Sequence, residues 1–208
     1  MSPVPRIAVV DYGIGNLRSA QKALERCGAA ASLTSDSATI SAADAVVLPG
    51  VGAFGACMES LRAADLEDPV RDAATGGVPF LGICVGMQML FSTSDESPGV
   101  PGLGIIAGNV GWLPESLPRP QMQWNRLRPT GDDPMFAGLG PEPWMYFVHS
   151  LHGVPADPVV VAATVDYGAS VNAAFRSGPI FAVQFHPEKS GASGLALLAN
   201  FVSVAARA

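Results

Sequence analysis

Gly82-Ile83-Cys84-Val85-Gly86, which follows the apolar run Pro79-Phe80-Leu81, is the stretch that decides how this chain folds. The apolar run predicts a buried strand, and a helix is expected from Val85 to Phe91. Glycines on both sides of Cys84 permit a tight, strained turn that presents the central side chain above a sheet. We therefore predict a strand–turn–helix unit with an exposed thiol, whose thiolate the free amides at the helix start stabilise.

The sequence around this turn alternates between strand and helix patterns. The expected strands are Arg6–Asp11, Ala30–Thr34, Ala45–Leu48 and Pro79–Ile83, and the expected helices are Asn16–Cys27, Ala56–Ala64 and Pro69–Thr75. Such alternation is typical of an α/β fold in which helices cover an open, mostly parallel sheet.

The second half of the chain has a different texture. Pro and Gly become frequent from about Pro98 to Pro134, which predicts an inserted β meander over the sheet instead of a separate domain. Further strands are expected at Trp144–His149, Val159–Thr164, Ala173–Arg176 and Ile180–Phe185, and a closing helix at Ser193–Ala206. We therefore expect a single domain over residues 1–208, with its core at about 5–206.

Composition narrows the function classes. A formal charge of −6 without clustered Lys and Arg argues against nucleic acid as a partner. The uncharged stretch Ala73–Ser94 is interrupted by Gly, Pro and Gln, so we expect no membrane span, and we expect no export signal. Cys27, Cys57 and Cys84 are odd in number and lack metal-ligand spacing, which favours a reducing cytoplasm and no metal or cofactor.

A second chemical motif, His186-Pro187-Glu188, follows the strand-like run Pro179–Phe185. Two residues apart on an extended segment, the imidazole and the carboxylate project from the same face, and Pro187 limits the backbone between them. The carboxylate then orients an imidazole that takes the thiol proton and later delivers one to the leaving group. We predict Cys84, His186 and Glu188 as a catalytic triad at the carboxyl edge of the sheet.

Acyl transfer also needs donors for the developing oxyanion. The backbone amide of Val85 is the first candidate, and the loop Pro49-Gly50-Val51-Gly52 can supply a second from a neighbouring strand end. The alternative for that loop is a plain turn between strand and helix. Gln88, one helical turn after the thiol, is a candidate to hold a polar substrate, and Glu96 to accept from its ammonium. The alternative for both is a solvated group at a helix end.

Several local patterns carry a resemblance over nearly the whole chain. They are Asp11-Tyr12-Gly13-Ile14-Gly15-Asn16-Leu17-Arg18-Ser19, Leu48-Pro49-Gly50-Val51-Gly52-Ala53-Phe54, Gly82-Ile83-Cys84-Val85-Gly86-Met87-Gln88, Met122 with Trp124-Asn125, and Tyr146-Phe147-Val148-His149-Ser150. The chain resembles the class I, triad-type glutamine amidotransferases, and among them the glutaminase subunits of imidazole glycerol phosphate synthase.

This resemblance implies an activity and a set of site residues. Glutamine would be hydrolysed to glutamate and ammonia, and the ammonia passed to a cyclase subunit of a heterodimer that makes imidazole glycerol phosphate and aminoimidazole carboxamide ribonucleotide in histidine biosynthesis. The implied residues are Cys84, His186 and Glu188 as triad, Gln88, Glu96, Ser150 and Leu151 as glutamine contacts, and Asn16, Trp124, Tyr146 and Lys189 at the cyclase interface.

The chain departs from the family pattern at a few positions. The family often reads Pro-His-Met-Gly-Trp-Asn where this chain has Pro120-Gln121-Met122-Gln123-Trp124-Asn125, and an aromatic residue often stands in place of Leu151. The first departure concerns docking, and the second matters less where only the backbone is used.

Other functions stay open at this point. The chain could serve another synthase, such as pyridoxal phosphate synthase, act as a thiol hydrolase on a different amide, or bind without catalysis. For a glutaminase that feeds a partner, we expect low activity alone and a switch of the Gly50–Gly52 loop into an oxyanion-stabilising form in the complex.

Overall fold

An eight-stranded sheet forms the centre of this computed structural model, which describes residues 3–208. In spatial order its strands are β2 (Ala30–Thr34), β1 (Arg6–Val10), β3 (Ala45–Gly50), β4 (Phe80–Cys84), β13 (Ile180–Val183), β12 (Ser170–Ser177), β11 (Val161–Asp166) and β8 (Arg128–Pro129). The strands from β2 to β13 are parallel, and β12, β11 and β8 are antiparallel additions. The predicted open, mostly parallel α/β sheet is confirmed.

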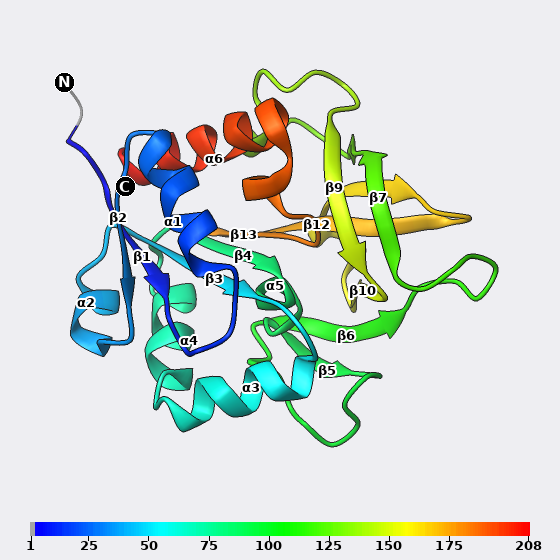
Figure 1. The fold of residues 1–208 in the computed structure, drawn as a ribbon, viewed down its shortest axis with the longest axis horizontal. Coiled ribbons are helices and arrows are strands. Elements are labelled where there is room, and N and C mark those ends of the chain that lie inside the picture. The colour runs from blue at the N-terminus through cyan, green and yellow to red at the C-terminus, as the bar shows by residue number, and fades with distance from the viewer. Residues whose placement is uncertain (1–2) are drawn as a thin grey trace.

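Helices cover both faces of this sheet. Figure 1 shows α1 (Leu17–Arg26) and α6 (Gly191–Ala205) on one side and α2 (Ser37–Ser41), α3 (Phe54–Ala63) and α4 (Glu67–Thr75) on the other. The chain order reverses after β2, so right-handed crossovers place α2 on the face opposite α1. Strands covered on both faces explain apolar runs such as Ala45–Leu48, which is fully buried.

Helix α1 shows how local sequence sets an element. Its buried residues Ala20, Ala23 and Leu24 lie three and four positions apart on one face. The helix ends at Arg26, and Gly28 follows with a φ of 95°, a left-handed conformation that glycine adopts without strain. The predicted amphipathic helix with a glycine at its end is therefore present.

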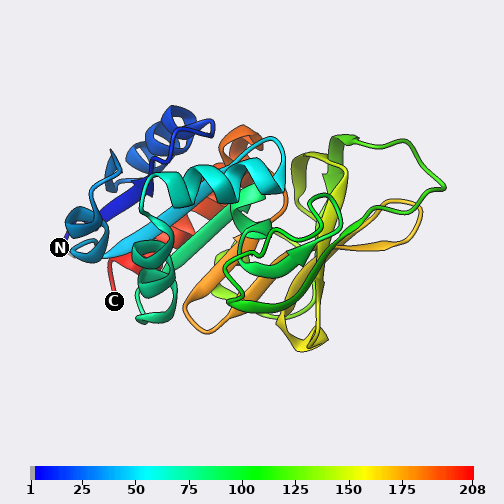
Figure 2. The same ribbon diagram turned by 90° about the horizontal axis from the view of Figure 1, so that it is seen from below.

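Two smaller sheets stand where a meander was expected. β6 (Ile106–Trp112) pairs with β5 (Phe91–Ser94) and β10 (Leu151–Pro155), whereas β7 (Gln121–Arg126) pairs with β9 (Trp144–His149). β6 and β7 thus belong to different sheets and do not pair with each other. Figure 2 shows these small sheets at the end of the molecule opposite both chain termini.

The expected helix Val85–Phe91 is wrong in its length. α5 spans only Val85–Gln88, and Phe91 already belongs to β5. The amides of Leu103 and Ile105 donate to the carbonyls of Met89 and Leu90. These carbonyls would accept from the next turn of α5 if the helix continued, so the loop that contains Leu103 and Ile105 ends the helix. A helix this short has a weak dipole, and its free amides are the main stabiliser that it offers the thiolate.

None of the helices in residues 3–208 combines the length and the apolar character needed to cross a bilayer.

Candidate active site

A cavity of about 580 Å³ opens at the carboxyl ends of β3 and β4. These strands and β13 are adjacent and parallel, with Gly50 opposite Cys84 and Ile83 opposite Val183, so the loops that follow them meet at one edge. The sequence-predicted residues that line the cavity are Asn16, Val51, Gly52, Cys84, Val85, Gln88, Glu96, Ser150, Leu151, His186 and Lys189. Thus one cavity gathers most of the predicted site.

Cys84 occupies the strained turn that the sequence predicts, but the prediction of an exposed thiol is wrong, because the residue is buried and only 4% exposed. Its φ of 55° and ψ of −115° are rare for a residue with a side chain. A Cβ on Gly86 would lie 1.9 Å from the Leu48 carbonyl oxygen, and one on Gly82 would lie 3.0 Å from the Cα of Met87. The backbone after the nucleophile therefore leaves no room for a side chain at Gly86, and the packing at Gly82 is tight.

Replacing Gly86 by alanine is expected to destabilise the fold and to displace Cys84. The added methyl has no room against the backbone of β3, and overpacking of this kind costs about 3 kcal/mol or more. Urea unfolding of Gly86→Ala measures the loss. Gly131→Ala is the matched control, because a Cβ at Gly131 meets nothing within 4 Å. Equal stability of the two variants would contradict the close packing at the turn.

The imidazole of His186 and the carboxylate of Glu188 are in contact as predicted, but the backbone between them has a different conformation from the one predicted. Nδ1 of His186 lies 2.8 Å from Oε1 of Glu188, and each side chain is only 3% exposed. The segment is not extended: Pro187–Lys189 forms a 3₁₀ turn, η3, with His186 at its start. Proline suits the first position of such a turn because its φ is preset and it needs no amide partner. The turn, not strand alternation, brings the two groups together.

The electrostatic environment favours a charged imidazole. Burial lowers the pKa of His186, but hydrogen bonds with Cys84 and Glu188 and the charges of both outweigh burial and raise the pKa to about 9. His186 is therefore cationic near neutral pH, which places a positive charge beside Cys84.

Strand β9 holds the His186 loop through its backbone. The amide of His186 donates to the Tyr146 carbonyl at 3.0 Å. The Ser190 hydroxyl donates to the His186 carbonyl at 2.6 Å and accepts from the Tyr146 amide at 3.0 Å. Sequence reasoning missed Ser190, whose only signal was its place just before the closing helix. These bonds tie the triad to the strand that carries the predicted interface residue Tyr146.

The Pro49–Gly52 loop packs directly against the nucleophile turn. The buried Tyr12 hydroxyl donates to the Pro49 carbonyl at 2.7 Å, and burial raises the pKa of Tyr12, so this hydroxyl keeps its proton. A Cβ on Gly50 would lie 2.6 Å from the Gly86 amide nitrogen. The thiol of Cys57 donates to the Val51 carbonyl at 3.3 Å. The loop thus lies where an oxyanion donor is needed, although Gly50 itself does not line the cavity.

Glu96 and Gln88 are both held by the protein and are not solvated helix-end groups. Glu96 Oε2 accepts from the Phe54 amide at 2.7 Å and so caps the start of α3 from the cavity wall. Gln88 is buried, and its Nε2 lies 3.5 Å from the Leu151 carbonyl. This contact lies within the protein, and the use of the Leu151 backbone to bind glutamine stays a prediction.

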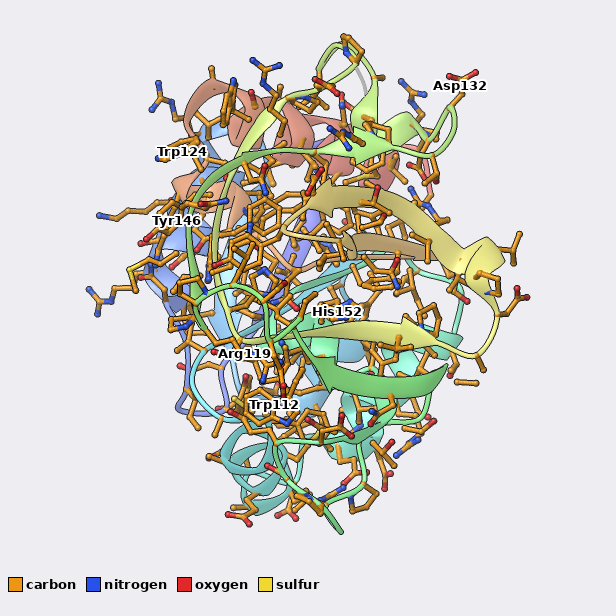
Figure 3. The ribbon with its side chains drawn as sticks, turned by 90° about the vertical axis from the view of Figure 1, so that its right-hand side faces the viewer. Trp112, Arg119, Trp124, Asp132, Tyr146 and His152 are labelled. Atoms are coloured by element: carbon orange, nitrogen blue, oxygen red, sulfur yellow. The ribbon has the colours of Figure 1, made fainter. Side chains whose placement is uncertain are left out.

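Trp124 and Tyr146 lie outside the cavity, on the β7–β9 ribbon. Their rings pack edge to face with centroids 6.0 Å apart, and Trp124 is 48% exposed. Figure 3 shows the two side chains next to each other on the exposed face of the ribbon. Asn16 and Lys189 line the cavity itself, and the Tyr146 carbonyl accepts from the His186 amide, so three of the four predicted interface residues contact the predicted active site. Trp124 is linked to it through its ring contact with Tyr146.

Gln121, where the chain departs from the family pattern, makes a buried hydrogen bond with His149. Gln121 faces His149 across the β7–β9 ladder, and the Nδ1 of His149 lies 2.7 Å from the Leu151 carbonyl oxygen. A carbonyl only accepts, so Nδ1 carries the proton, and burial lowers the pKa of His149 to about 4, which keeps the ring neutral. Its Nε2 is then an acceptor, 2.9 Å from the Gln121 carboxamide. An orientation with the Gln121 amide nitrogen toward His149 satisfies this acceptor, and it gives a partner to a nitrogen otherwise buried without one. Gln123, by contrast, is exposed.

His149 is expected to make stability depend on pH. Its folded pKa of about 4 lies below the ordinary 6.5, so the unfolded chain binds the proton first, and the full stability present above 6.5 is lost as pH falls toward 4. The loss between about pH 7.5 and about pH 5 is roughly 2 kcal/mol. Urea unfolding of wild type and His149→Gln at both pH values isolates this loss, because other groups, including His186 with its opposite trend, cancel in the difference. Equal pH slopes would contradict a buried neutral ring.

Comparison with known proteins places this chain in a named family. The model of the family described as glutamine amidotransferase class-I matches residues 8–205. The chain is 52% identical over 200 residues to the imidazole glycerol phosphate synthase subunit HisH of Deinococcus radiodurans, with 95% of this chain and 93% of that protein covered. It is 50% identical over 212 residues to the subunit of the same name from Synechococcus elongatus, which covers 100% of this chain and 97% of that one.

Among solved structures, PurLQS from Thermotoga maritima superimposes with a TM-score of 0.74 at 21% identity, and the match covers 97% of this chain and 99% of that one. This likeness shows a shared fold. The family match over most of the sequence and the identities near one half go further: the chain belongs to the class I glutamine amidotransferase family.

Proposed function

We propose that this chain is the glutaminase subunit of imidazole glycerol phosphate synthase and hydrolyses L-glutamine with Cys84 as nucleophile. The observation that carries this proposal is the strained Cys84 turn in one cavity with a buried His186–Glu188 pair. The HisH relatives supply the choice of synthase, because each is named as a subunit of that enzyme.

The reaction begins with the Cys84 thiolate and the His186 imidazolium. The sulfur attacks the side-chain amide carbon of glutamine, and the carbonyl oxygen becomes an oxyanion held by the Val85 amide and an amide of the Gly50–Gly52 loop. As the intermediate collapses, the carbon–nitrogen bond breaks and His186 gives its proton to the departing nitrogen. Ammonia leaves, and a glutamyl thioester remains on Cys84.

Hydrolysis of the thioester reverses these roles. Neutral His186 takes a proton from water, the hydroxide attacks the thioester carbon, and the carbon–sulfur bond breaks to release glutamate. Glu188 holds the Nδ1 side of the ring in both halves, so Nε2 is the atom that exchanges protons. The thiolate and imidazolium are restored for the next turnover.

A partner that receives the ammonia is part of this proposal. Free ammonia that equilibrates with water becomes mostly ammonium, which is not a nucleophile, so the receiving site must close over the cavity. We assign docking of a cyclase subunit to Trp124, Tyr146, Asn16 and Lys189; Asn16 and Lys189 line the cavity, and Trp124 packs on Tyr146. The backbone bond from His186 to Tyr146 links this face to the triad. A reduced Cys84 is required throughout, which fits work in the cytoplasm.

An assay of ammonia release, with and without the cyclase and its nucleotide ligand, tests the proposal. We expect slow hydrolysis by the chain alone and a strong rise only when both are added. A rise with the synthase of pyridoxal phosphate instead would reassign the partner. Fast turnover without any partner would contradict the switch of the Gly50–Gly52 loop, and no hydrolysis of glutamine under any condition would contradict the function.

A further inference from the structure

Gln184 is a fully buried glutamine that bridges the nucleophile and Gln88. It follows strand β13, two residues before His186. Its Nε2 donates to the Cys84 sulfur at 3.8 Å, and its Oε1 accepts from Gln88 Nε2 at 3.1 Å. The mechanism proposed above does not use this side chain.

The orientation of both amides follows from a backbone carbonyl. The Leu151 carbonyl only accepts, so the Gln88 atom that faces it, at 3.5 Å, is the amide nitrogen. This nitrogen also faces Gln184, which must therefore present its oxygen. The Gln184 nitrogen is then left to face Cys84. The Leu151 carbonyl itself accepts from the Nδ1–H of His149 at 2.7 Å. The direction of each hydrogen bond in this series therefore determines the direction of the next.

The burial of Gln184 argues against a role in packing alone. A carboxamide away from water is costly unless its polar atoms are paired, and a methionine or leucine fills a similar space without that cost. Both ends of the Gln184 amide are paired, and both partners are residues of the site.

We propose that Gln184 is a positioning residue with two separate effects. Its N–H, aimed at the Cys84 sulfur, favours the thiolate, because a hydrogen bond to the charged form stabilises that form. Its oxygen holds the Gln88 nitrogen, so that Gln88 turns its own oxygen toward the cavity. An oxygen there accepts an N–H of the substrate and repels a carboxylate. The second effect rests on the proposed glutaminase function, whereas the first does not.

Two substitutions separate these effects. Gln184→Glu keeps the shape and the acceptor for Gln88 but removes the donor to sulfur and adds a negative charge. Gln184→Met keeps the length and removes both contacts. Gln21→Glu makes the same chemical change on helix α1, outside the site, and is the matched control.

The first measurement is the rate of Cys84 alkylation by iodoacetamide against pH. In Gln184→Glu we expect the pH of half-maximal rate to rise by about one unit or more, in Gln184→Met by less, and in Gln21→Glu not at all. Unchanged profiles in both Gln184 variants would overturn the contact with sulfur. Because alkylation needs no glutamine, a shift in a chain that fails to hydrolyse glutamine would uphold this role and reject the proposed function.

The second measurement is the steady-state rate of the complex with the cyclase. We expect Gln184→Glu to lower kcat about tenfold with little change in KM. We expect Gln184→Met both to lower kcat and to raise KM about tenfold. Equal effects of the two variants on KM would overturn the hold on Gln88.

If neither variant folds, the wild type still tests the proposal. The side-chain ¹⁵N resonance of Gln184 is then expected to move with pH as the sulfur titrates, and to lose that dependence in Cys84→Ala. A Gln184 chemical shift that does not change as the sulfur titrates would contradict the contact.

Discussion

Replacement of Cys84 by serine is expected to lower glutamine hydrolysis by about 10⁵-fold or more, which is the scale seen when the nucleophile of a triad is removed. A hydroxyl in the same place stays protonated near neutral pH, so the His186 imidazolium has no thiolate to pair with. Ammonia release by the complex with the cyclase measures the loss.

The matched control for this change is Cys27→Ser. Cys27 follows helix α1, where its thiol donates to the Leu195 carbonyl at 3.4 Å and does not line the cavity. We expect its rate to stay near that of the wild type. A Cys84→Ser protein that keeps its fold and a tenth of its activity would show that the chemistry does not pass through this sulfur.

Glu188→Gln is expected to lower the rate by about 10³- to 10⁴-fold, the scale found when the acid of a triad is made neutral. The carboxylate helps to raise the pKa of His186 to about 9, so its removal lowers that pKa and reduces the fraction of imidazolium available to protonate the leaving nitrogen. An amide facing Nδ1 also permits the wrong ring tautomer. The pH–rate profile and kcat of the complex measure both consequences.

Stability is expected to change much less than activity in this variant. Within residues 3–208, Glu188 Oε2 is buried and has no hydrogen-bond partner, so a neutral amide removes a costly charge even as it weakens the bond to His186. Glu142→Gln is the control, since Glu142 forms exposed ion pairs with Arg126 and Arg128. A Glu188→Gln rate close to that of Glu142→Gln would contradict the role of the carboxylate.

Elements that depend on local pattern were predicted well. The bounds of Ala30–Thr34 and Trp144–His149 agree with β2 and β9, because alternating or continuous apolar residues specify a strand wherever it pairs. The end of the helix after Cys84 was not predictable in this way. It is set by the return of Leu103 and Ile105 to the carbonyls of Met89 and Leu90, which is a contact between segments that the local pattern does not encode.

The same distinction applies to the site. Cys84 and His186 could be predicted because each follows an apolar strand, and parallel strands end at one edge. The contact of His186 with Glu188 was predicted for an extended backbone, whereas the segment is a 3₁₀ turn. Side chains two residues apart can meet in either conformation. Tyr12 and Gln184 had no assigned role, because their partners lie on distant segments; Gln184 and Gln88 are 96 residues apart.

The most direct measurement of the central chemistry is mass spectrometry of the protein after rapid acid quenching during turnover with glutamine. We predict the mass of one added glutamyl group, located by proteolysis on the peptide that contains Cys84 and removed by hydroxylamine. The Glu188→Gln variant, in which turnover is slow, is measured in the same way. Release of ammonia by this variant without a glutamyl adduct would contradict the account, and so would an adduct on Cys27 or Cys57.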